Sequence, residues 1–400
     1  MSEKIVLAYS GGLDTSVAIR WLQEHYGADI ATLTMDLGGK VDLETARQRA
    51  LDIGAIRADI LDAREEFIDE YVWPALQAGA LYEGVYPLAT ALGRPLIAKH
   101  LVRIALEESA FAIAHGCTGK GNDQVRFDVS AIALAPAMKV IAPAREWGMT
   151  RDDEIAYAQK NQIPLEINKR SAYSVDENIW GRSIEAGDLE NPWMEPPEDA
   201  YAWTVSVSDA PESPEYIEIT FETGIPVAIN GEKLKSVSLV ENLNEIAGKH
   251  GVGRIDHIEN RLVGIKSREI YEAPAGHVLH QAHKSLEQMC LSKEQTRFKD
   301  RVSQEYADIV YNGLWFTAHR ENLDAYIKNS QSHVNGIVRT RLHKGTSTVV
   351  GRSSDESLYQ HNLATYDAGD TFDHQASVGF ISVFGLPVKT QAEIQGGEAT

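Results

Sequence analysis

The stretch that decides the fold is IVLAYSGGLDTS, Ile5 to Ser16, where an apolar run ends in two glycines and continues as helix-like sequence. The run from Ile5 to Leu7 suits a buried strand of a parallel sheet. Gly11 and Gly12 permit tight backbone geometry. The helix that follows can be capped by one of three polar side chains, Asp14, Thr15 or Ser16. The stretch therefore predicts a strand, a loop and a helix.

A loop of this kind can bind an anion, because its backbone N–H groups point outward and its glycines have no side chains to block a phosphate. No Gly-Lys-Ser/Thr follows, which argues against a Walker A site. A dinucleotide fingerprint is also missing, although Asp36 ends the second apparent strand. A GxSxG elbow would need glycine where Ala8 stands, so we do not expect Ser10 to be a nucleophile.

The string AYSGGLDTS instead resembles the SGGxDTS loop of the PP-loop ATP pyrophosphatase superfamily. In that superfamily the loop holds the pyrophosphate end of ATP while the α-phosphate is attacked. The resemblance implies adenylation chemistry.

Length and composition bound the remaining possibilities. With 400 residues, 43% of them hydrophobic, the chain can build a large core and two domains. No secretory signal is evident, and no apolar run approaches the ~18 residues that a membrane helix needs. Cys117 and Cys290 form no disulfide framework, which fits a reducing cytoplasm. A net charge of −20 disfavours a nucleic-acid surface. We expect a cytoplasmic protein that binds no nucleic acid and no membrane.

The first part of the chain alternates between strands and helices, as a parallel sheet requires. Strands are predicted at Ile30 to Asp36, Arg57 to Leu61, Phe111 to Ala114 and Lys139 to Ala142, and helices at Thr15 to Tyr26, Leu43 to Ile53, Pro95 to Ser109 and Val129 to Leu134.

A second glycine loop, HGCTGKGNDQVRF, runs from His115 to Phe127 and mixes both signs of charge. A phosphate alone would not call for Asp123, whereas a zwitterionic amino acid needs donors for its carboxylate and acceptors for its ammonium. An internally satisfied polar loop is the alternative. Both glycine loops follow strands of one parallel sheet, so we expect them to face one cleft.

The second part of the chain reads as a mixed α+β domain. The segment from Trp180 to Thr204 is rich in proline, tryptophan and acid and predicts a connector with little regular structure. Later elements are predicted as a strand at Tyr216 to Phe221, a hairpin at Asn230-Gly231, a helix at Leu239 to His250, long helical sequence from Ala275 to Tyr311 and strands within Ile337 to Val350.

Five ordered segments together resemble the argininosuccinate synthetase family. They are SGGLDTS, LYEGVYPLATALGRP (Leu81 to Pro95), TGKGNDQVRF (Thr118 to Phe127), SVDENIWGRS (Ser174 to Ser183) and GVGRIDHIENRLVGIKSREIYEAPA (Gly251 to Ala275). The resemblance implies a cytoplasmic homotetramer of arginine synthesis that joins L-citrulline to L-aspartate through a citrullyl-adenylate. ATP is the substrate, with Mg²⁺, and AMP and pyrophosphate are released.

The resemblance also implies a fold and a domain plan. We expect an α/β, HUP-like nucleotide-binding PP-loop domain at 1–168, a mixed α+β synthetase domain at 169–365 and a C-terminal tail at 366–400. The tail contains VGFISVF, and we expect it to dock on a neighbouring subunit, with packing on its own domain as the competing view.

Carried over residue by residue, the resemblance assigns three sets of binding residues and no catalytic residue. The ATP set is Ala8, Tyr9, Ser10, Gly11, Gly12, Leu13, Asp14, Thr15, Ser16, Met35 and Gly116. The aspartate set is Thr118, Asn122 and Asp123. The citrulline set is Tyr86, Asn122, Arg126, Ser174, Ser183, Glu259 and Tyr271, with Arg126 on the carboxylate and Glu259 on the ammonium.

One position departs from the family. The chain reads TALGRP where the family commonly has TSLARP, so Ala91 replaces a serine hydroxyl that contacts citrulline. Thr90, Tyr86 or water must then supply that contact. We expect altered affinity, because one neutral hydrogen bond contributes about 0.5 to 1.5 kcal/mol.

Other candidates are weaker. His277, His280 and His283 have helical spacing but no HExxH motif or added carboxylate, so we expect no metal site. Cys117 has no evident His–Asn relay and reads as a loop-filling thiol. VRTRLHKG, Val338 to Gly345, reads as a solvated strand face.

Three functions stay open at this stage. Besides argininosuccinate synthesis, the chain could be another PP-loop activator or a non-catalytic ATP-binding regulator. An amidotransferase-linked synthetase would want a glutaminase, and a tRNA thiolase would want a basic face or redox cysteines; neither feature is present.

Overall fold

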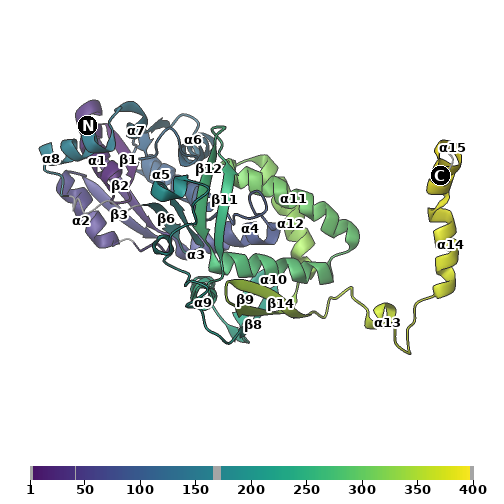
Figure 1. The fold of residues 1–400 in the computed structure, drawn as a ribbon. Helices are drawn as coiled ribbons and strands as arrows, with labels where there is room; N and C mark the ends of the chain where they lie inside the picture. Colours follow the sequence, from purple (N-terminus) through teal and green to yellow (C-terminus); the bar gives the residue numbers. More distant parts are fainter. Residues whose placement is uncertain (1–2, 41, 165–172, 397–400) are drawn as a thin grey trace. The chain divides into compact units, whose positions relative to one another are not determined.

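The computed structural model describes residues 3–40, 42–164 and 173–396, which form two compact units, Met1–Glu356 and Ser357–Thr400 (Figure 1). The boundary expected between residues 168 and 169 lies outside the described residues. The first unit contains three sheets, and both glycine loops belong to it.

A parallel five-stranded sheet begins the first unit, with the order β3-β2-β1-β4-β5. Its strands are β1 (Lys4–Ala8), β2 (Asp29–Asp36), β3 (Arg57–Asp62), β4 (Ala112–Ala114) and β5 (Lys139–Ile141). The predicted α/β alternation and parallel sheet are confirmed. The chain order reverses between β1 and β4, and ligands of open α/β sheets bind beside such a switch point.

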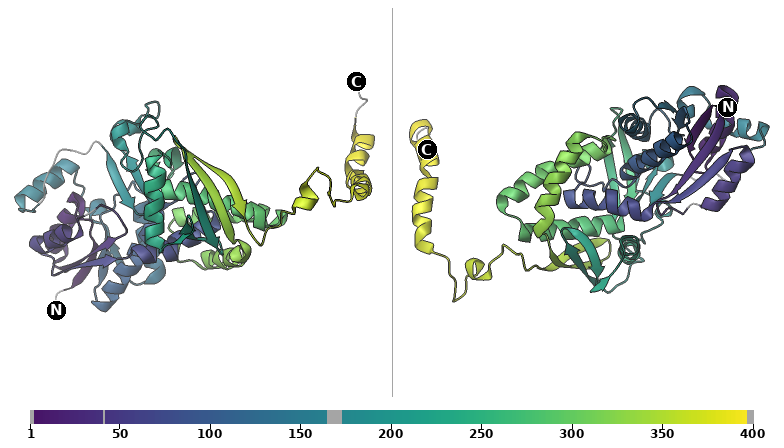
Figure 2. Two further views of the ribbon diagram at one scale, coloured as in Figure 1. Left: turned by 90° about the horizontal axis from the view of Figure 1, so that it is seen from below. Right: turned by 180° about the vertical axis from the view of Figure 1, so that it is seen from behind.

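Helices cover both faces of this sheet (Figure 2). They are α1 (Leu13–Tyr26), α2 (Leu43–Ile53), α5 (Ala89–Glu107), α6 (Asp123–Leu134), α7 (Pro143–Glu146) and α8 (Arg151–Lys160). Alternate residues of β1 point to opposite faces, so Ile5 and Leu7 share a core with α1 and α2, whereas Val6 packs with α5 and α6. Burial on both faces explains why β1 is apolar throughout.

Two helices, α5 and α6, begin six residues earlier than predicted. Helix α5 begins at Ala89 and contains Pro95, because Leu88 adopts φ 64° and the Tyr86 hydroxyl accepts a hydrogen bond from the Thr90 N–H at 3.0 Å. The prediction that this helix begins at Pro95 is wrong. Helix α6 begins at Asp123, inside the segment predicted as loop.

The second sheet is antiparallel, with the order β11-β12-β7-β6. Its strands are β6 (Ser174–Asn178), β7 (Gly181–Glu185), β11 (Arg254–Asn260) and β12 (Lys266–Glu272). Strand β7 and two 3₁₀ turns, η2 (Gly187–Glu190) and η3 (Glu198–Ala200), occupy a segment predicted to have little regular structure, so that prediction is wrong at its start. The strands are rich in charge and lack a clean apolar alternation, which hid them in the sequence.

The third sheet is antiparallel, with the order β10-β9-β8-β13-β14. It contains β8 (Glu215–Glu222), β9 (Ile225–Ile229), β10 (Glu232–Lys233), β13 (Gly336–His343) and β14 (Thr346–Ser353). The predicted hairpin at Asn230-Gly231 is confirmed, since both residues have positive φ, 50° and 81°. Exposed Arg339 and Arg341 on β13 agree with the predicted solvated face.

The remaining helices of the first unit complete the α+β part. They are α3 (Arg64–Phe67), the π-helical turn η1 (Ile68–Val72), α4 (Trp73–Ala78), α9 (Ser236–Lys249), α10 (Pro274–Cys290), α11 (Lys293–Tyr311), α12 (Ala318–Ser330) and the 3₁₀ turn η4 (Gln331–His333). The long helical sequence after Ala275 is broken at Ser292, which caps α11 in a reciprocal capping box with Gln295. The predicted mixed α+β region is thus confirmed.

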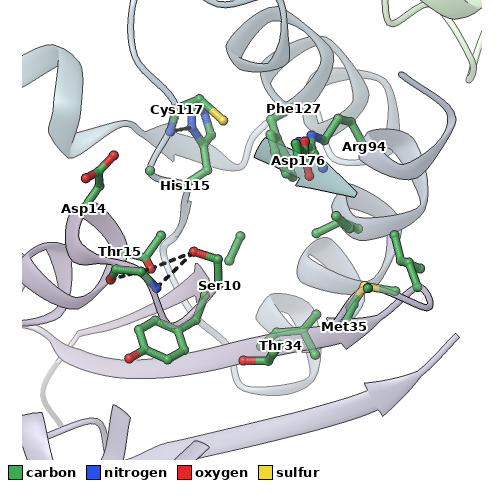
Figure 3. Close-up of a pocket in the computed structure, with 18 of the residues that line it drawn as sticks. Ser10, Asp14, Thr15, Thr34, Met35, Arg94, His115, Cys117, Phe127 and Asp176 are labelled. Atoms are coloured by element: carbon green, nitrogen blue, oxygen red, sulfur yellow. Dashed lines mark hydrogen bonds and ion pairs between the residues drawn. The ribbon is translucent and has the colours of Figure 1, made fainter. Parts of the chain in front are cut away.

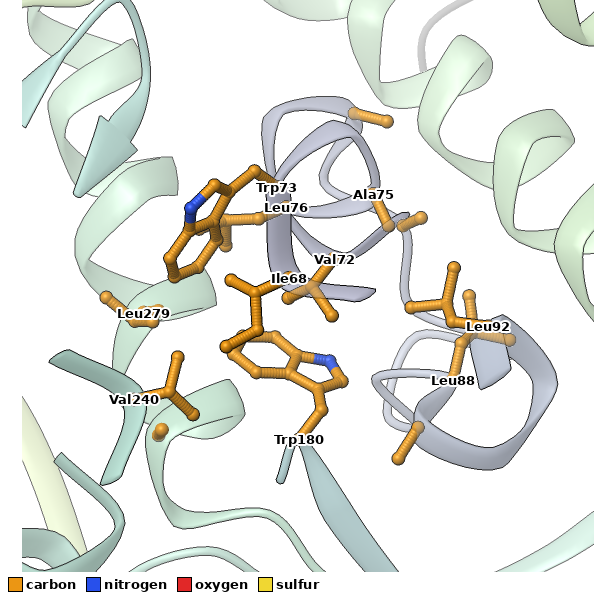
Figure 4. Packing of buried hydrophobic residues seen from close by; sticks show 14 of the residues in the cluster. Ile68, Val72, Trp73, Ala75, Leu76, Leu88, Leu92, Trp180, Val240 and Leu279 are labelled. Atoms are coloured by element: carbon orange, nitrogen blue, oxygen red, sulfur yellow. The ribbon is translucent and has the colours of Figure 1, made fainter. Parts of the chain in front are cut away.

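A single apolar core joins the segments on either side of the second sheet (Figure 4). Trp180 is buried edge-on against Trp73, with ring centroids 6.2 Å apart, and its Nε1 donates to the Pro87 carbonyl at 2.9 Å. Leu88 and Leu92 of α5 pack in the same cluster. This core fixes the start of α5 relative to the second sheet.

The second unit contains α13 (His361–Ala364), α14 (His374–Phe384) and α15 (Leu386–Gln395). Its helices expose several large apolar side chains, among them Val378, Phe380, Ile381, Val383 and Phe384. None of the helices described has the length and apolarity to span a bilayer.

Candidate active site

The loop between β1 and α1 is a turn of backbone amides at a helix start. Gly11 has φ 77°, and a Cβ there would lie 2.9 Å from the Cβ of Ala46. Arg49 Nη1 donates to the Gly11 carbonyl at 2.6 Å. Gly12 is the N-cap and no side chain caps α1, so the expected cap by Asp14, Thr15 or Ser16 is wrong. The first amides of α1 consequently have no capping side chain, which suits an anion.

A cavity of about 530 Å³ opens at this loop (Figure 3). It is lined by nine of the eleven residues expected at ATP: Ala8, Tyr9, Ser10, Gly12, Leu13, Asp14, Thr15, Met35 and Gly116. Gly11 faces Ala46 instead, and buried Ser16 bonds the Tyr9 hydroxyl at 3.0 Å. Apolar Leu33, Leu37 and Ile97 line the wall around Met35.

The second glycine loop meets the first across this cavity. A Cβ on Gly116 would lie 2.8 Å from Cγ2 of Thr15, so glycine is needed for the approach. Buried His115 is held on both ring nitrogens: Nδ1 accepts from the Cys117 N–H at 3.2 Å, and Nε2 lies 2.9 Å from the Asp128 carboxylate. Burial and nearby Asp123 raise the pKa of Cys117, which keeps it a thiol as the loop-filling reading requires.

Two guanidinium groups surround Asp123 at the start of α6. Its carboxylate accepts from Arg94 Nη2 and from Arg126 Nη1, both at 2.8 Å. Burial opposes ionisation, but the two cations outweigh it and lower the pKa of Asp123 to about 2. Arg94 Nη2 also donates to Asp176 on β6.

A second cavity, of about 110 Å³, lies on the far side of this ion cluster. Its wall includes Tyr86, Asn122, Asp123, Arg126, Ser183, Glu259 and Tyr271, all of them expected at citrulline or aspartate. Thr118 and Ser174 are exposed and line neither cavity. Asn122 joins three elements, because Nδ2 donates to the Tyr311 hydroxyl at 2.7 Å and Oδ1 accepts from the Leu262 N–H at 2.9 Å.

Opposite charges face each other across this small cavity. Glu259 is 3% exposed and accepts hydrogen bonds from the hydroxyls of Tyr271 and Tyr311, both at 2.6 Å. Arg126 is 3% exposed; its Nε donates to the Tyr311 carbonyl at 2.9 Å, and its buried Nη2 has no partner among the described residues. Tyr86 stacks on Tyr271 with centroids 4.0 Å apart, which fixes the apolar wall between the charges.

Comparison with known proteins identifies the family from end to end. The family model of the argininosuccinate synthase N-terminal HUP domain matches residues 4–164, and the family model of the argininosuccinate synthase C-terminal domain matches residues 173–391. The chain belongs to the argininosuccinate synthase family. Argininosuccinate synthase of Dehalococcoides mccartyi strain 195 is 59% identical over 99% of this chain and 97% of its own. Those of Symbiobacterium thermophilum and Brevibacillus brevis are 58% and 56% identical, over 99% of this chain and 99% and 94% of theirs.

The family departure at Ala91 has a structural counterpart. Ala91 is fully buried in α5 and lines neither cavity, whereas Tyr86 and Thr90 do line the smaller one. Their hydroxyls are 2.9 Å apart. The polar surface near position 91 is therefore provided by this pair.

Several residues that line the two cavities were not predicted from the sequence. They are Arg94, Asp176, Glu185, Arg261, Glu269 and Tyr311. Arg261 Nη2 bridges Glu185 and Glu269, and burial together with the Glu185 charge raises the pKa of Glu269 to about 8 despite that contact. Glu269 and Tyr271 share one face of β12, so period-two alternation would have found Glu269 once that strand was recognised.

The three histidines of α10 lie apart from this site. His283 Nε2 lies 2.8 Å from the Gln331 side-chain oxygen, and burial lowers the pKa of His280 to about 3. In residues 3–40, 42–164 and 173–396 no group of three or more metal-ligating side chains gathers.

Proposed function

We propose that this protein makes argininosuccinate from citrulline, aspartate and ATP, and that it releases pyrophosphate and then AMP. The observation that carries the proposal is the meeting of two unlike cavities at one wall, in a chain of the argininosuccinate synthase family. The larger has the uncapped amides of a phosphate loop, and the smaller has a cation opposite an anion.

In the first half-reaction the ureido oxygen of citrulline attacks the α-phosphate of ATP. Residues Ala8 to Ser16 hold the phosphates with backbone amides, Met35 lies beside the adenine, and Gly116 lets the second loop approach the nucleotide. Gly11 and Ser16 act through the loop's shape, because neither lines the cavity. Adenylation converts the ureido oxygen into a leaving group, and positioning supplies much of the rate.

Citrulline binds by its zwitterionic end in the small cavity. The free Nη2 of Arg126 donates to the carboxylate, and Glu259 accepts from the ammonium. Tyr86, Asn122, Ser183 and Tyr271 complete the wall. Ser174, exposed at the start of β6, is assigned to citrulline on the family resemblance alone. Both ligand charges are then paired with buried side chains of opposite sign.

Aspartate binds beside it, at Thr118, Asn122 and Asp123. Arg94 and Arg126 each donate a hydrogen bond to one oxygen of Asp123. Each carboxylate oxygen can accept a further hydrogen bond, so Asp123 can also accept one from the ligand ammonium. Thr118 is exposed in the same glycine loop, and its assignment to aspartate rests on the family resemblance.

Mg²⁺ fits the phosphate end of the larger cavity. Magnesium is usually held by one or two carboxylates together with substrate phosphates, and Asp14 lines the cavity at the start of α1. Burial and the charge of Asp14 raise the pKa of neighbouring Glu154 to about 8, which marks an excess of negative charge that a cation would relieve. When bound, the ion neutralises phosphate charge.

We also propose a cytoplasmic homotetramer in which the C-terminal tail docks on a neighbouring subunit. The apolar side chains of α14, Val378, Phe380, Ile381, Val383 and Phe384 among them, support this because they stay largely exposed in this unit. The domain plan, with a synthetase domain from 169 to 365 and a tail from 366, is part of the same proposal.

The test is a reconstituted reaction with ATP, Mg²⁺, citrulline and aspartate. AMP and argininosuccinate should form together, and pyrophosphate exchange into ATP should require citrulline but not aspartate. A non-catalytic nucleotide binder would release no pyrophosphate, and another PP-loop activator would ignore citrulline.

A further inference from the structure

We propose that Asp176 is the general base that takes a proton from the aspartate ammonium, so that the amine can attack the adenylated ureido carbon. The inference rests on the function proposed above. Asp176 alone, among the described residues, belongs to the walls of both cavities. The reacting carbon must lie where the two cavities meet, since citrulline's charged end and the ATP phosphates occupy opposite sides.

The fold holds the Asp176 carboxylate at this junction. Asp176 lies in the middle of β6, paired with Ser183 of β7, and Arg94 of α5 binds its Oδ2. The same Arg94 nitrogen binds Asp123 at 2.8 Å, which ties Asp176 to the proposed aspartate site. Figure 3 shows Asp176 and Arg94 together, across the cavity from Ser10 and Thr15. A ligand amine near Asp123 is thus within reach of Asp176.

Asp176 is a better proton acceptor than its neighbour. Both oxygens of Asp123 bind guanidinium groups, whereas Oδ1 of Asp176 accepts no hydrogen bond from the described residues, and its side chain is 42% exposed. The groups around it are Arg94 on α5, Asp123 and Arg126 on α6, and Cys117 in the second loop. Partial burial and the charge of Asp123 raise the pKa of Asp176 despite Arg94, which makes it the more basic carboxylate.

After adenylation the former ureido carbon carries a positive charge that is delocalised over its nitrogens, and its oxygen is bonded to the phosphorus of AMP. The Asp176 carboxylate accepts one proton from the aspartate ammonium, and the freed lone pair forms the N–C bond. The C–O bond breaks with its electron pair going to the AMP oxygen, which takes the second proton of the attacking nitrogen as the guanidinium forms. Asp176 returns its proton to solvent.

The decisive variant is Asp176→Asn, which keeps the shape and a hydrogen-bond acceptor for Arg94. We expect citrulline-dependent pyrophosphate exchange within about threefold of wild type, because adenylation needs no base. Argininosuccinate formation should fall at least ~100-fold, the usual lower bound for loss of a general base. Hydroxylamine, which is unprotonated at neutral pH, should still capture the adenylate at the wild-type rate.

The pH profile separates a base from a merely structural residue. The wild-type rate of condensation should level off once Asp176 is ionised, whereas the rate of Asp176→Asn should keep rising up to the pKa of the aspartate amine itself. A structural role would instead raise KM for aspartate, leave the shape of the profile unchanged and reduce hydroxylamine capture. Asp176→Glu, which retains a carboxylate, should recover the wild-type profile.

The outcomes are distinguishable. Condensation by Asp176→Asn within tenfold of wild type, with an unchanged pH profile, would overturn the proposal while leaving the enzyme's function intact. Absence of citrulline-dependent exchange in the wild-type protein would overturn the proposed function, and this inference with it.

Discussion

Replacing Glu259 by glutamine tests the zwitterion clamp most directly. The carboxylate is 3% exposed and accepts two tyrosine O–H bonds at 2.6 Å, from Tyr271 and Tyr311. The amide keeps the shape and one acceptor oxygen but loses the charge that should hold the citrulline ammonium. The other half of the amide is a donor, so one tyrosine hydroxyl must turn away from it.

The expected effect on citrulline follows from the value of a charged hydrogen bond. Such a bond contributes about 1.5 to 3 kcal/mol, which corresponds to a rise of roughly 10- to 150-fold in KM for citrulline. KM for ATP should stay within about twofold, because Glu259 does not line the nucleotide cavity. The free energy of unfolding should fall by about 1 to 3 kcal/mol, for the tyrosine hydroxyl left without its acceptor.

The assay is citrulline-dependent pyrophosphate exchange, with citrulline varied at saturating ATP, alongside urea denaturation of each variant. Glu83→Gln is the matched control, because Glu83 accepts from His257 at 2.8 Å and from Asn260 on the same β11 strand, yet it does not line the small cavity. It should leave KM for citrulline unchanged. Equal effects of the two substitutions on KM, or none from Glu259→Gln, would refute the clamp.

Four further predictions follow from named contacts. Asp123→Ala should leave the affinity for an ATP analogue unchanged, measured by calorimetry, yet cripple condensation with aspartate; unchanged product formation would contradict the proposed aspartate site. Gly116→Ala should raise KM for ATP at least tenfold, because its Cβ would lie 2.8 Å from Thr15 Cγ2 and must push the two loops apart; a normal KM would show that the loops yield freely. Trp180→Ala should lower the free energy of unfolding by about 3 to 5 kcal/mol through the cavity left in the core, and a loss below 1 kcal/mol in urea titrations would mean that the core collapses around it. The pKa of Glu269 is raised from 4.5 to about 8, so the folded state keeps a proton that the unfolded state has lost, and the free energy of unfolding should fall as pH rises through this window. In denaturation curves, Glu269→Gln should flatten this dependence of the free energy of unfolding on pH. An identical dependence in the variant would exclude Glu269 as its source.

The nucleotide cavity could be predicted closely from the sequence because its parts are contiguous. The strand, the glycines and the helix start lie within Ile5 to Ser16, and nine of eleven expected ATP residues line one cavity. Periodicity also sufficed for the parallel sheet, whose inner strands β1 and β2 are largely buried and read as apolar runs. The start of α5 was missed because a side chain, the Tyr86 hydroxyl, binds the Thr90 amide near a helix start that lies six residues before Pro95, at Ala89.

The amino-acid cavity could not be assembled in this way. Its walls come from α5, α6, the second sheet and the end of α11, and the Asn122 side chain joins Leu262 and Tyr311 only after the chain has folded. The strands that carry Ser183, Glu259 and Tyr271 are polar where they face the cavity, so the alternation that reveals a half-buried strand is absent. The resemblance to the family predicted those residues, whereas the hydrophobic pattern of the sequence did not.

The same distribution explains why adenylation and condensation can be separated by mutation. The phosphate loop belongs to the parallel sheet, the clamp of Arg126 and Glu259 spans two elements of the small cavity, and Asp176 stands between them on a third. Arg94 links Asp176 to Asp123 without touching Glu259. A change at Glu259 therefore weakens citrulline binding and with it both half-reactions, whereas a change at Asp176 leaves the first half-reaction intact. Measuring pyrophosphate exchange and argininosuccinate formation on both variants should give these two different patterns, and a common pattern would mean that the ion cluster acts as one undivided unit.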